Sequence, residues 1–257
     1  YTPQLSALRV DYAVADAPVT AQYVLTPFGY RSHEEVLALV SGDAEAAAQF
    51  GYAVSLSGDG NTLAVGAPYR TERDAVECGA VYLFDRLDEG WVQQVKLLLP
   101  DSEAPDTEGV HFGHSVSLDH AGRTLAVGTP KQVRGRVYLY SRESGGWNPT
   151  PQTVAYSKST AGRYGHAVSL SGDGRTLAIG EPEGKMYPDD SNSTVKSGLV
   201  HLYDLIDKQW RPNVYLPAVS FAVEGAKLGT SVSLNNDGTV LAVGAPGYVY
   251  ELSLIHI

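Results

Sequence analysis

Two histidines stand at the same place of an internal repeat, because His114 and His166 each follow the glycine that opens a repeated segment. Histidine titrates near neutral pH and ligates metals, so such a pair is a candidate for acid–base or metal chemistry. Tyr52 and Thr230 hold the same place in two further copies. A position that accepts tyrosine and threonine requires a polar group rather than a metal ligand. We therefore predict a structural role for both histidines.

Acidic side chains gather in two stretches, residues 101–108 and 189–192. Each stretch has several oxygen ligands of the kind that a hard cation prefers. Neither has the regular ligand spacing and interposed glycine of a calcium-binding loop. We interpret both stretches as solvated loops.

Motifs for nucleophilic, zinc or phosphate chemistry do not occur in the sequence. It has no Gly-x-Ser-x-Gly elbow, no His-Glu-x-x-His motif and no Gly-x-x-x-x-Gly-Lys-Ser/Thr loop. Cys78 is the only cysteine, which excludes a disulfide within the chain and a zinc site made of several cysteines. His111 and His201 lie at unrelated positions, and we assign neither a chemical role. We predict no catalytic residue, no metal site and no cofactor.

The repeated segment in which His114 and His166 stand occurs first from Phe50 to Pro68, and it returns three times. Apolar and small residues alternate on both sides of a turn such as Ser57–Asn61, and this pattern predicts a tight β-hairpin. The strands carry almost no charge, which indicates a sheet packed on both faces. The opening and closing glycines are separated by the same number of residues in all four copies. The pairs are Gly51 with Gly66, Gly113 with Gly128, Gly165 with Gly180, and Gly229 with Gly244.

A second pair of strands follows each hairpin. The third strand is predicted over residues 79–84, 135–140, 198–203 and 247–250, each rich in aromatic residues. Trp91, Trp147 and Trp210 open the fourth strand of the first three repeats. Four antiparallel strands per repeat describe the blade of a β-propeller. Because the aromatic residues recur at equivalent positions, we interpret them as packing between blades rather than as a carbohydrate platform.

The Phe50-Gly51 opening and the Gly66-Ala67-Pro68 closing resemble the FG-GAP repeat, the blade of propellers similar to that of integrin α-subunits. The resemblance covers residues 50–250, and it implies an all-β propeller of about seven blades. Calcium-binding members of the family carry a longer first hairpin with an Asp-x-Asp-x-Asp-Gly type of loop, whereas the turn here keeps one aspartate. A hard cation needs about six to eight oxygen ligands, so we do not transfer the calcium site.

The pattern predicts a single β-propeller domain over residues 1–251. Within it we predict a degenerate partial blade at 1–40, blades at 50–99, 112–154 and 164–216, and a partial blade at 228–250. That is about four and a half blades of the seven that the resemblance implies, so we expect the chain to be an incomplete fragment of a ring that continues on both sides. Residues 252–257 resemble the translation of a sequencing adapter, and we interpret them as a non-native tail.

Loops of variable length share one face of this arrangement, which we call the variable-loop face. It holds the connections from second to third strands and the crossings between blades, and variable loops on a rigid scaffold are where binding usually resides. Asn192 begins a glycosylation sequon in one of these loops. We predict that the following residues contact a ligand: Tyr69, Arg70, Arg73, Lys131, Arg134, Lys185, Tyr187 and Asp189.

The net charge of −10 over 257 residues argues against a nucleic-acid partner, and no apolar run is long enough to predict a membrane span. The family resemblance implies a non-enzymatic module for cell adhesion that binds a protein or glycan ligand, extracellular or at the cell surface. Two alternatives stay open. One is a propeller hydrolase or an accessory domain of an extracellular enzyme, and the other is a purely structural surface repeat.

Overall fold

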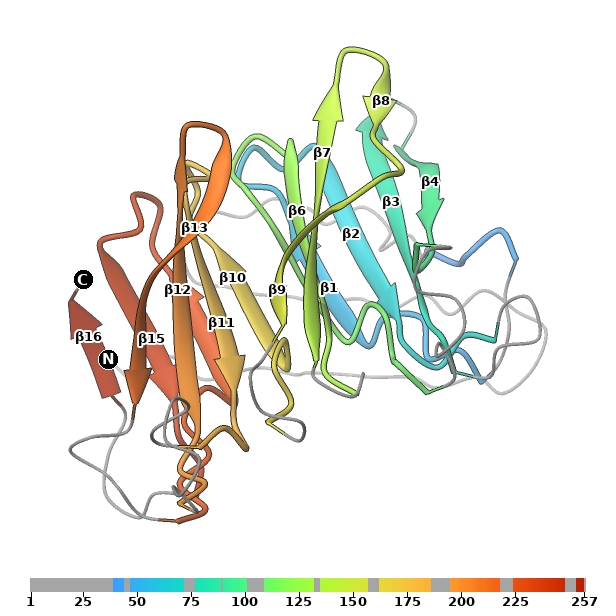
Figure 1. Cartoon of the computed structure of the whole chain (residues 1–257). Coiled ribbons are helices and arrows are strands. Elements are labelled where there is room, and N and C mark those ends of the chain that lie inside the picture. Colours follow the sequence, from blue (N-terminus) through green and yellow to red (C-terminus); the bar gives the residue numbers. More distant parts are fainter. Residues whose placement is uncertain are drawn as a thin grey trace, which may run out of the picture. The chain divides into compact units, whose positions relative to one another are not determined.

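The computed structural model describes residues 39–43, 47–71, 77–88, 90–100, 109–131, 135–156, 162–185, 195–217, 224–247 and 253–256. The regular elements in these ranges are all β-strands, and they form antiparallel sheets (Figure 1). The chain divides into a unit Tyr1–Ser41 and a unit Gly42–Ile257, and the sheets belong to the second unit. Residues 1–38 of the predicted partial blade lie outside the described ranges.

The first and third blades have the four strands that the sequence predicted. The first blade has the strand order β1 (Ala53–Leu56), β2 (Thr62–Ala67), β3 (Ala80–Leu87) and β4 (Gly90–Leu97). The third blade repeats this order with β10 (Ala167–Leu170), β11 (Thr176–Glu181), β12 (Leu199–Ile206) and β13 (Gln209–Pro217). The prediction of a β-propeller built from four-stranded antiparallel blades is confirmed.

The second blade differs in its last strand. After β5 (Ser115–Leu118), β6 (Thr124–Thr129) and β7 (Arg136–Glu143), two short strands pair with β7, namely β8 (Gly146–Trp147) and β9 (Gln152–Tyr156). The predicted continuous strand is therefore divided. Pro149 and Pro151 lie between the two pieces. Because proline has no N–H to donate to a strand ladder, these residues explain the interruption.

The fourth blade consists of β14 (Ser231–Leu234), β15 (Val240–Gly244) and β16 (Ser253–His256) among the described residues. The strand paired with β15 lies later than the sequence pattern placed it, since Val240 pairs with His256 and Val243 with Ser253. Residues 248–250, which we predicted as this strand, lie outside the described ranges. The strand that does pair with β15 falls in the segment predicted to be a non-native tail.

Local turn chemistry explains the first hairpin of each blade. In β1–β2, the Ser57 hydroxyl accepts the Thr62 N–H at 2.9 Å and donates to the Asp59 carboxylate at 2.6 Å. Asp59 also accepts the Asn61 N–H at 3.0 Å. Ser171 and Asp173 repeat this arrangement in the third blade. Side chains that replace missing backbone partners in this way stabilise a tight turn, so the turn aspartate is already engaged.

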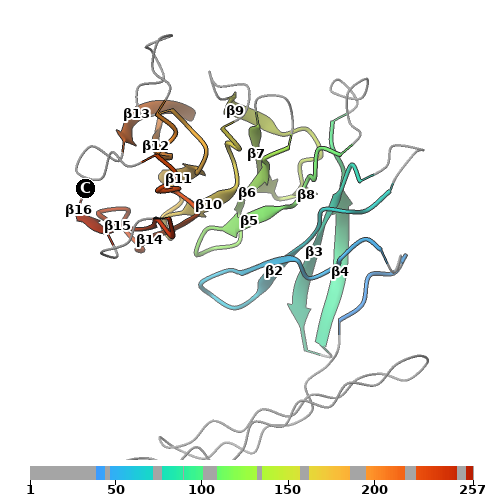
Figure 2. The ribbon, with the colours of Figure 1, turned by 90° about the horizontal axis from the view of Figure 1, so that it is seen from below.

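Successive blades pack through their first strands, which contact each other in the order β1, β5, β10 and β14; the last three are labelled in Figure 2. Val116 and Leu118 of β5 are buried against Ala64, Val81 and Leu83 of the first blade. Equivalent apolar clusters join the second blade to the third and the third to the fourth. Burial of this apolar surface is the main favourable contribution to blade stacking.

A polar contact accompanies each of these apolar interfaces. The Leu118 N–H donates to the Ser55 hydroxyl at 2.9 Å, so a serine of one first strand accepts a backbone N–H from the next. The same contact recurs at the two later interfaces, at 2.9 Å in each: Leu170 to Ser117 and Leu234 to Ser169. The recurrence indicates one interface that is repeated three times, with the same residues in the same roles.

Candidate functional site

Three side chains from three blades meet where the chain enters the first strands. The Tyr52 hydroxyl lies 3.2 Å from His114 Nε2, and the two rings have centroids 5.0 Å apart. The His114 and His166 rings follow, with centroids 4.8 Å apart. The shared repeat position therefore brings these side chains into a row that crosses the blade interfaces.

Tyr69 and His111 extend this row over the variable-loop face. Their ring centroids lie 4.4 Å apart, and Tyr69 also contacts Tyr52 edge to face. His111 Nε2 lies 3.1 Å from a carboxylate oxygen of Glu77. We call Tyr52, Tyr69, His111, His114 and His166 the Tyr–His cluster. The sequence gives no signal for a role of His111, because this residue lies in a connection and its partners come from other segments.

The three imidazoles of the Tyr–His cluster are held in their neutral form. Burial lowers the pKa of His114 to about 4, and the neighbouring His166 and Arg163 contribute in the same direction. Burial also lowers the pKa of His111 and of His166. In each imidazole Nδ1 is buried and has no hydrogen-bond partner within the described part of the chain. Neutral, packed imidazoles of this kind support the aromatic rings that they contact and are poorly suited to accept a proton at neutral pH.

The predicted ligand-contact residues fall into different environments. Tyr69 is partly buried in the Tyr–His cluster, Lys131 is exposed, and Lys185 is partly buried where its backbone forms a bridge with Lys196. Arg70 is occupied by an ion pair that is described next. Five of the residues that we singled out lie outside the described ranges: Arg73, Arg134, Tyr187, Asp189 and Asn192.

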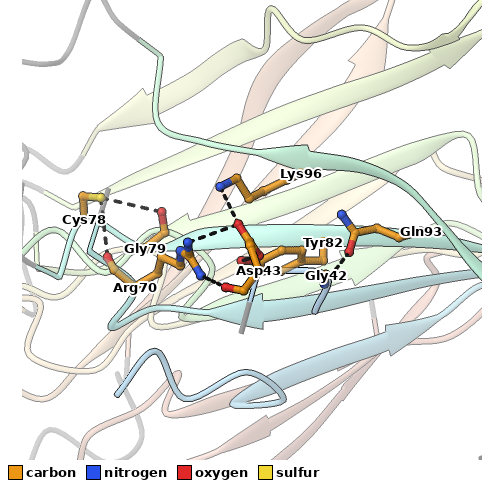
Figure 3. A network of polar contacts seen from close by, with 8 residues as sticks. All are labelled: Gly42, Asp43, Arg70, Cys78, Gly79, Tyr82, Gln93 and Lys96. Atoms are coloured by element: carbon orange, nitrogen blue, oxygen red, sulfur yellow. Dashed lines mark hydrogen bonds and ion pairs between the residues drawn. The ribbon is translucent and has the colours of Figure 1, made fainter. Parts of the chain in front are cut away.

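Asp43 accepts hydrogen bonds and ion pairs from side chains of the first blade, as Figure 3 shows. Its carboxylate lies 2.8 Å from Lys96 Nζ and 3.1 Å from an Arg70 guanidinium nitrogen, and it accepts the Tyr82 hydroxyl at 2.9 Å. Arg70 also donates to the Asp43 carbonyl. Burial alone would raise the pKa of Asp43, but the hydrogen bonds from Lys96 and Tyr82 and the two positive charges lower it. Arg70 thus fastens the segment before β1 to the blade.

Replacing Asp43 with alanine is expected to lower the free energy of unfolding by about 1 kcal/mol. The side chain is 39% exposed, so solvent screens part of the interaction, while Tyr82 and the two cations lose their shared acceptor. Urea denaturation followed by tryptophan fluorescence measures the change. Asp88→Ala is the matched control, because Asp88 is exposed in the turn after β3. Equal midpoints for the two variants would contradict the anchoring role of Asp43.

A second polar pair, with a buried carboxylate, lies in the third blade. His201 Nε2 lies 2.7 Å from a carboxylate oxygen of Glu181, whose exposed fraction is 1%. The Tyr164 ring packs edge to face against the His201 ring. This pair was not among the predicted sites, although two simultaneous departures from the repeat signalled it. Glu181 stands where Ala67 closes the first repeat, and His201 stands where the first blade has a tyrosine.

An open cavity of about 510 Å³ lies at the turn and hairpin end of the second blade, lined by Ala121, Arg123, Arg142, Glu143 and Ser144. Arg142 binds Asp85 of the first blade through two contacts of 2.8 and 2.5 Å. Its charge is therefore already compensated. Glu143 also brings negative charge to the same wall, so the cavity does not present the concentrated positive charge that an anion site requires.

Among the residues that the structure describes, no three His, Cys, Asp or Glu side chains come together in a way that would hold a metal ion. Within those ranges the chain likewise forms no helix of the length and apolarity needed to cross a membrane.

Known proteins resemble this chain in sequence. Residues 34–84 match the model of the FG-GAP repeat. Integrin alpha-3 of Mus musculus is 31% identical over 150 residues, which cover 55% of this chain and 14% of that protein. Integrin alpha-7 of Rattus norvegicus is 33% identical over 147 residues, 54% of this chain and 12% of that protein. The chain thus spans a small part of the length of these relatives.

Among solved structures, the beta-propeller domain of Cps50 (Swd1) from Myceliophteria thermophila aligns with a TM-score of 0.47 and 11% identity. The alignment covers 80% of this chain and 53% of that one. The repeated hairpins form the four-stranded blades of a β-propeller, and in sequence the chain is similar to integrin α-subunits over about half of its length and to the FG-GAP repeat over residues 34–84.

Proposed function

We propose that this propeller is a non-enzymatic binding module, extracellular or at the cell surface, that engages a protein ligand through its variable-loop face. The similarity to integrin α-subunits supports a binding role. The observation that carries the proposal is the exposure of Tyr52, which is 46% exposed directly before β1, where the chain enters the first blade. Exposed tyrosines that are held rigidly are frequent anchors of protein interfaces.

The packing around Tyr52 makes it suitable as an anchor. Tyr69 and His114 contact its ring from two sides, and the His114 contact includes a hydrogen-bonding distance to the hydroxyl. A side chain that is already fixed loses little conformational entropy when a partner binds. The exposed Lys131 lies in a variable loop of the same face and adds a positive charge.

The enzyme alternative receives less support from the described residues. A general acid or base works best when its pKa lies near the working pH, whereas the pKa of His114 is about 4 and those of His111 and His166 are also lowered. The same histidines stack on aromatic rings and on each other. Their arrangement favours support of a binding surface.

Replacing Tyr52, Tyr69 and Lys131 together is expected to reduce ligand binding at least about tenfold, which corresponds to about 1.4 kcal/mol. We would use Tyr52→Thr, because threonine stands at the equivalent position in the fourth repeat, together with Tyr69→Ala and Lys131→Ala. Binding of the purified chain to arrays of immobilised extracellular-matrix proteins and of glycans measures the effect, and it separates a protein ligand from a glycan.

The control variant changes exposed apolar residues on the edge strands of the first and third blades. Val92, Val214 and Tyr215 on β4 and β13 are 44%, 42% and 41% exposed, and their replacement by alanine should leave binding unchanged. Calorimetry of both variants checks that the fold is retained. Unchanged binding of the Tyr52, Tyr69 and Lys131 variant to every bound array component would overturn the assignment of this face.

A further inference from the structure

Tyr52, the proposed ligand anchor, rests on a titratable side chain. Its hydroxyl lies 3.2 Å from His114 Nε2, and its ring packs on the His114 ring with centroids 5.0 Å apart. His114 is 9% exposed, whereas Tyr52 is 46% exposed. The buried imidazole is thus in direct contact with the exposed anchor, so a change in its charge acts directly on Tyr52.

The hydrogen-bonding surroundings of His114 suit a neutral imidazole. A neutral imidazole has one N–H donor and one acceptor nitrogen, whereas an imidazolium has two N–H donors. Nε2 faces the Tyr52 hydroxyl, which can either donate or accept. Nδ1 is buried and has no hydrogen-bond partner within the described ranges. A proton taken up by His114 would therefore leave a charged donor buried without an acceptor, which is costly.

The charged and titratable side chains that act on His114 also oppose a positive charge there. The His166 ring lies beside the His114 ring, with centroids 4.8 Å apart, and Arg163 and His111 come from the crossings between blades. Burial first, and then His166, Arg163 and His111, lower the pKa of His114 to about 4. The backbone of His166 is the weakest influence on this pKa and acts in the opposite direction.

The two carboxylates of this region act on other groups. A carboxylate oxygen of Glu77 lies 3.1 Å from His111 Nε2, so a positive charge on His111 would be compensated. Glu183 lies 3.7 Å from a guanidinium nitrogen of Arg163, and it acts on the third imidazole as well. Among the described groups that act on His114 there is no carboxylate. Of the three imidazoles in the Tyr–His cluster, His114 is therefore the one whose charge has no such compensation.

We propose that acid switches off ligand binding at Tyr52, with His114 as the proton acceptor. This regulation rests on the proposed function, because it acts on the anchor named there. Protonated His114 has to move towards water to solvate its charge, and the Tyr52 ring then loses the contact that fixes it. A mobile anchor loses more conformational entropy on binding, so the affinity falls. The affinity is highest above about pH 6.5 and decreases as the pH falls towards 4.

Binding of the purified chain to immobilised extracellular-matrix proteins, compared at about pH 7.5 and about pH 4.5, tests the switch. We expect binding to be at least about tenfold weaker at the lower pH. His114→Gln keeps a polar group beside the Tyr52 hydroxyl but cannot take up a proton, so its affinities at the two pH values should be equal. His120→Gln is the matched control, because His120 is exposed in the turn between β5 and β6, and it should keep the full pH dependence. Calorimetry at the lower pH checks that the fold is retained.

The Tyr52 ring provides a second readout that needs no ligand. In a chain with isotope-labelled tyrosine rings, the NMR signal of Tyr52 is the one that is absent from Tyr52→Thr. We expect this signal to move between pH 6.5 and pH 4 while the chain stays folded, and to stay in place over the same range in His114→Gln. A purely structural role of His114 would change the stability without moving this signal.

The possible outcomes distinguish the acid switch from the proposed function. Absence of binding to every array component at about pH 7.5 overturns both. Equal binding at the two pH values, or an unchanged pH dependence in His114→Gln, overturns the acid switch alone. A Tyr52 signal that stays in place in the folded, unchanged chain does the same. If His114→Gln binds at neither pH, its NMR titration decides, because that measurement needs no ligand.

Discussion

Replacing Gly128 with alanine is expected to destabilise the propeller by about 3 kcal/mol or more. A Cβ on Gly128 would lie 2.1 Å from the Gly165 carbonyl oxygen and 2.3 Å from the Ser115 hydroxyl oxygen. The Ser115 hydroxyl already donates to that carbonyl at 2.8 Å, so both obstacles are fixed. The second and third blades would have to separate. Calorimetry and urea denaturation should show a lower melting temperature and an earlier midpoint.

Two other glycines provide controls for this prediction. Gly145 has no atom near the place of an added Cβ, so Gly145→Ala should change the free energy of unfolding by less than about 0.5 kcal/mol. Gly244 closes the fourth repeat, where a Cβ would meet chiefly the side chain of Ser231, which can rotate. Gly244→Ala should therefore cost much less than Gly128→Ala. A Gly128 variant as stable as the Gly145 variant would contradict the close blade contact.

Acidification is expected to destabilise the propeller between about pH 6.5 and pH 4 through the Tyr–His cluster. Burial lowers the pKa of His114 from 6.5 to about 4, with His166 and Arg163 as further causes. The unfolded chain therefore binds protons in this range before the folded chain does. The stability that neutral His114 contributes is fully present above pH 6.5, and it is lost as the pH falls towards 4. His111 and His166, whose pKa values are also lowered, add to the loss.

The expected loss from His114 alone is about 2 kcal/mol, after a reduction for its incomplete burial. Urea denaturation at several pH values measures it. His114→Tyr is the informative variant, because Tyr52 stands at the equivalent position of the first blade, and it should flatten the profile between pH 6.5 and 4. The carboxylate of Asp43 titrates below this range, since its pKa is lowered from 3.8. A His114→Tyr profile as steep as that of the unchanged chain would refute the role of His114.

Strand and turn positions followed from the sequence because their causes are local. The alternation of β1 and β2 and the Ser57–Asp59 turn involve residues within one hairpin, and the structure reproduces them. The interruption of the predicted fourth strand after Trp147 also has a local cause, because Pro149 and Pro151 cannot donate to the strand ladder. The repeat pattern nevertheless led us to predict a continuous strand.

The candidate site depended on contacts that no local pattern contains. Tyr52 and His114 lie 62 residues apart in the chain, and Tyr69 of the first blade contacts His111 in the crossing to the second blade. The sequence placed Tyr69 on the variable-loop face and gave His114 a structural role, but it did not reveal that these groups meet. Arg70 was predicted to contact a ligand, and only the structure shows its ion pair with Asp43.

The sequence by itself determined that this chain forms repeated four-stranded blades, because hydrophobic alternation, turn chemistry and glycine spacing act over short distances. The tertiary structure alone decided which equivalent residues are buried. Val54 and Val116 have nearly identical neighbours in sequence, yet one is exposed and the other lies in a core. Burial depends on the surface that packs against a strand, and that surface comes from a distant part of the chain.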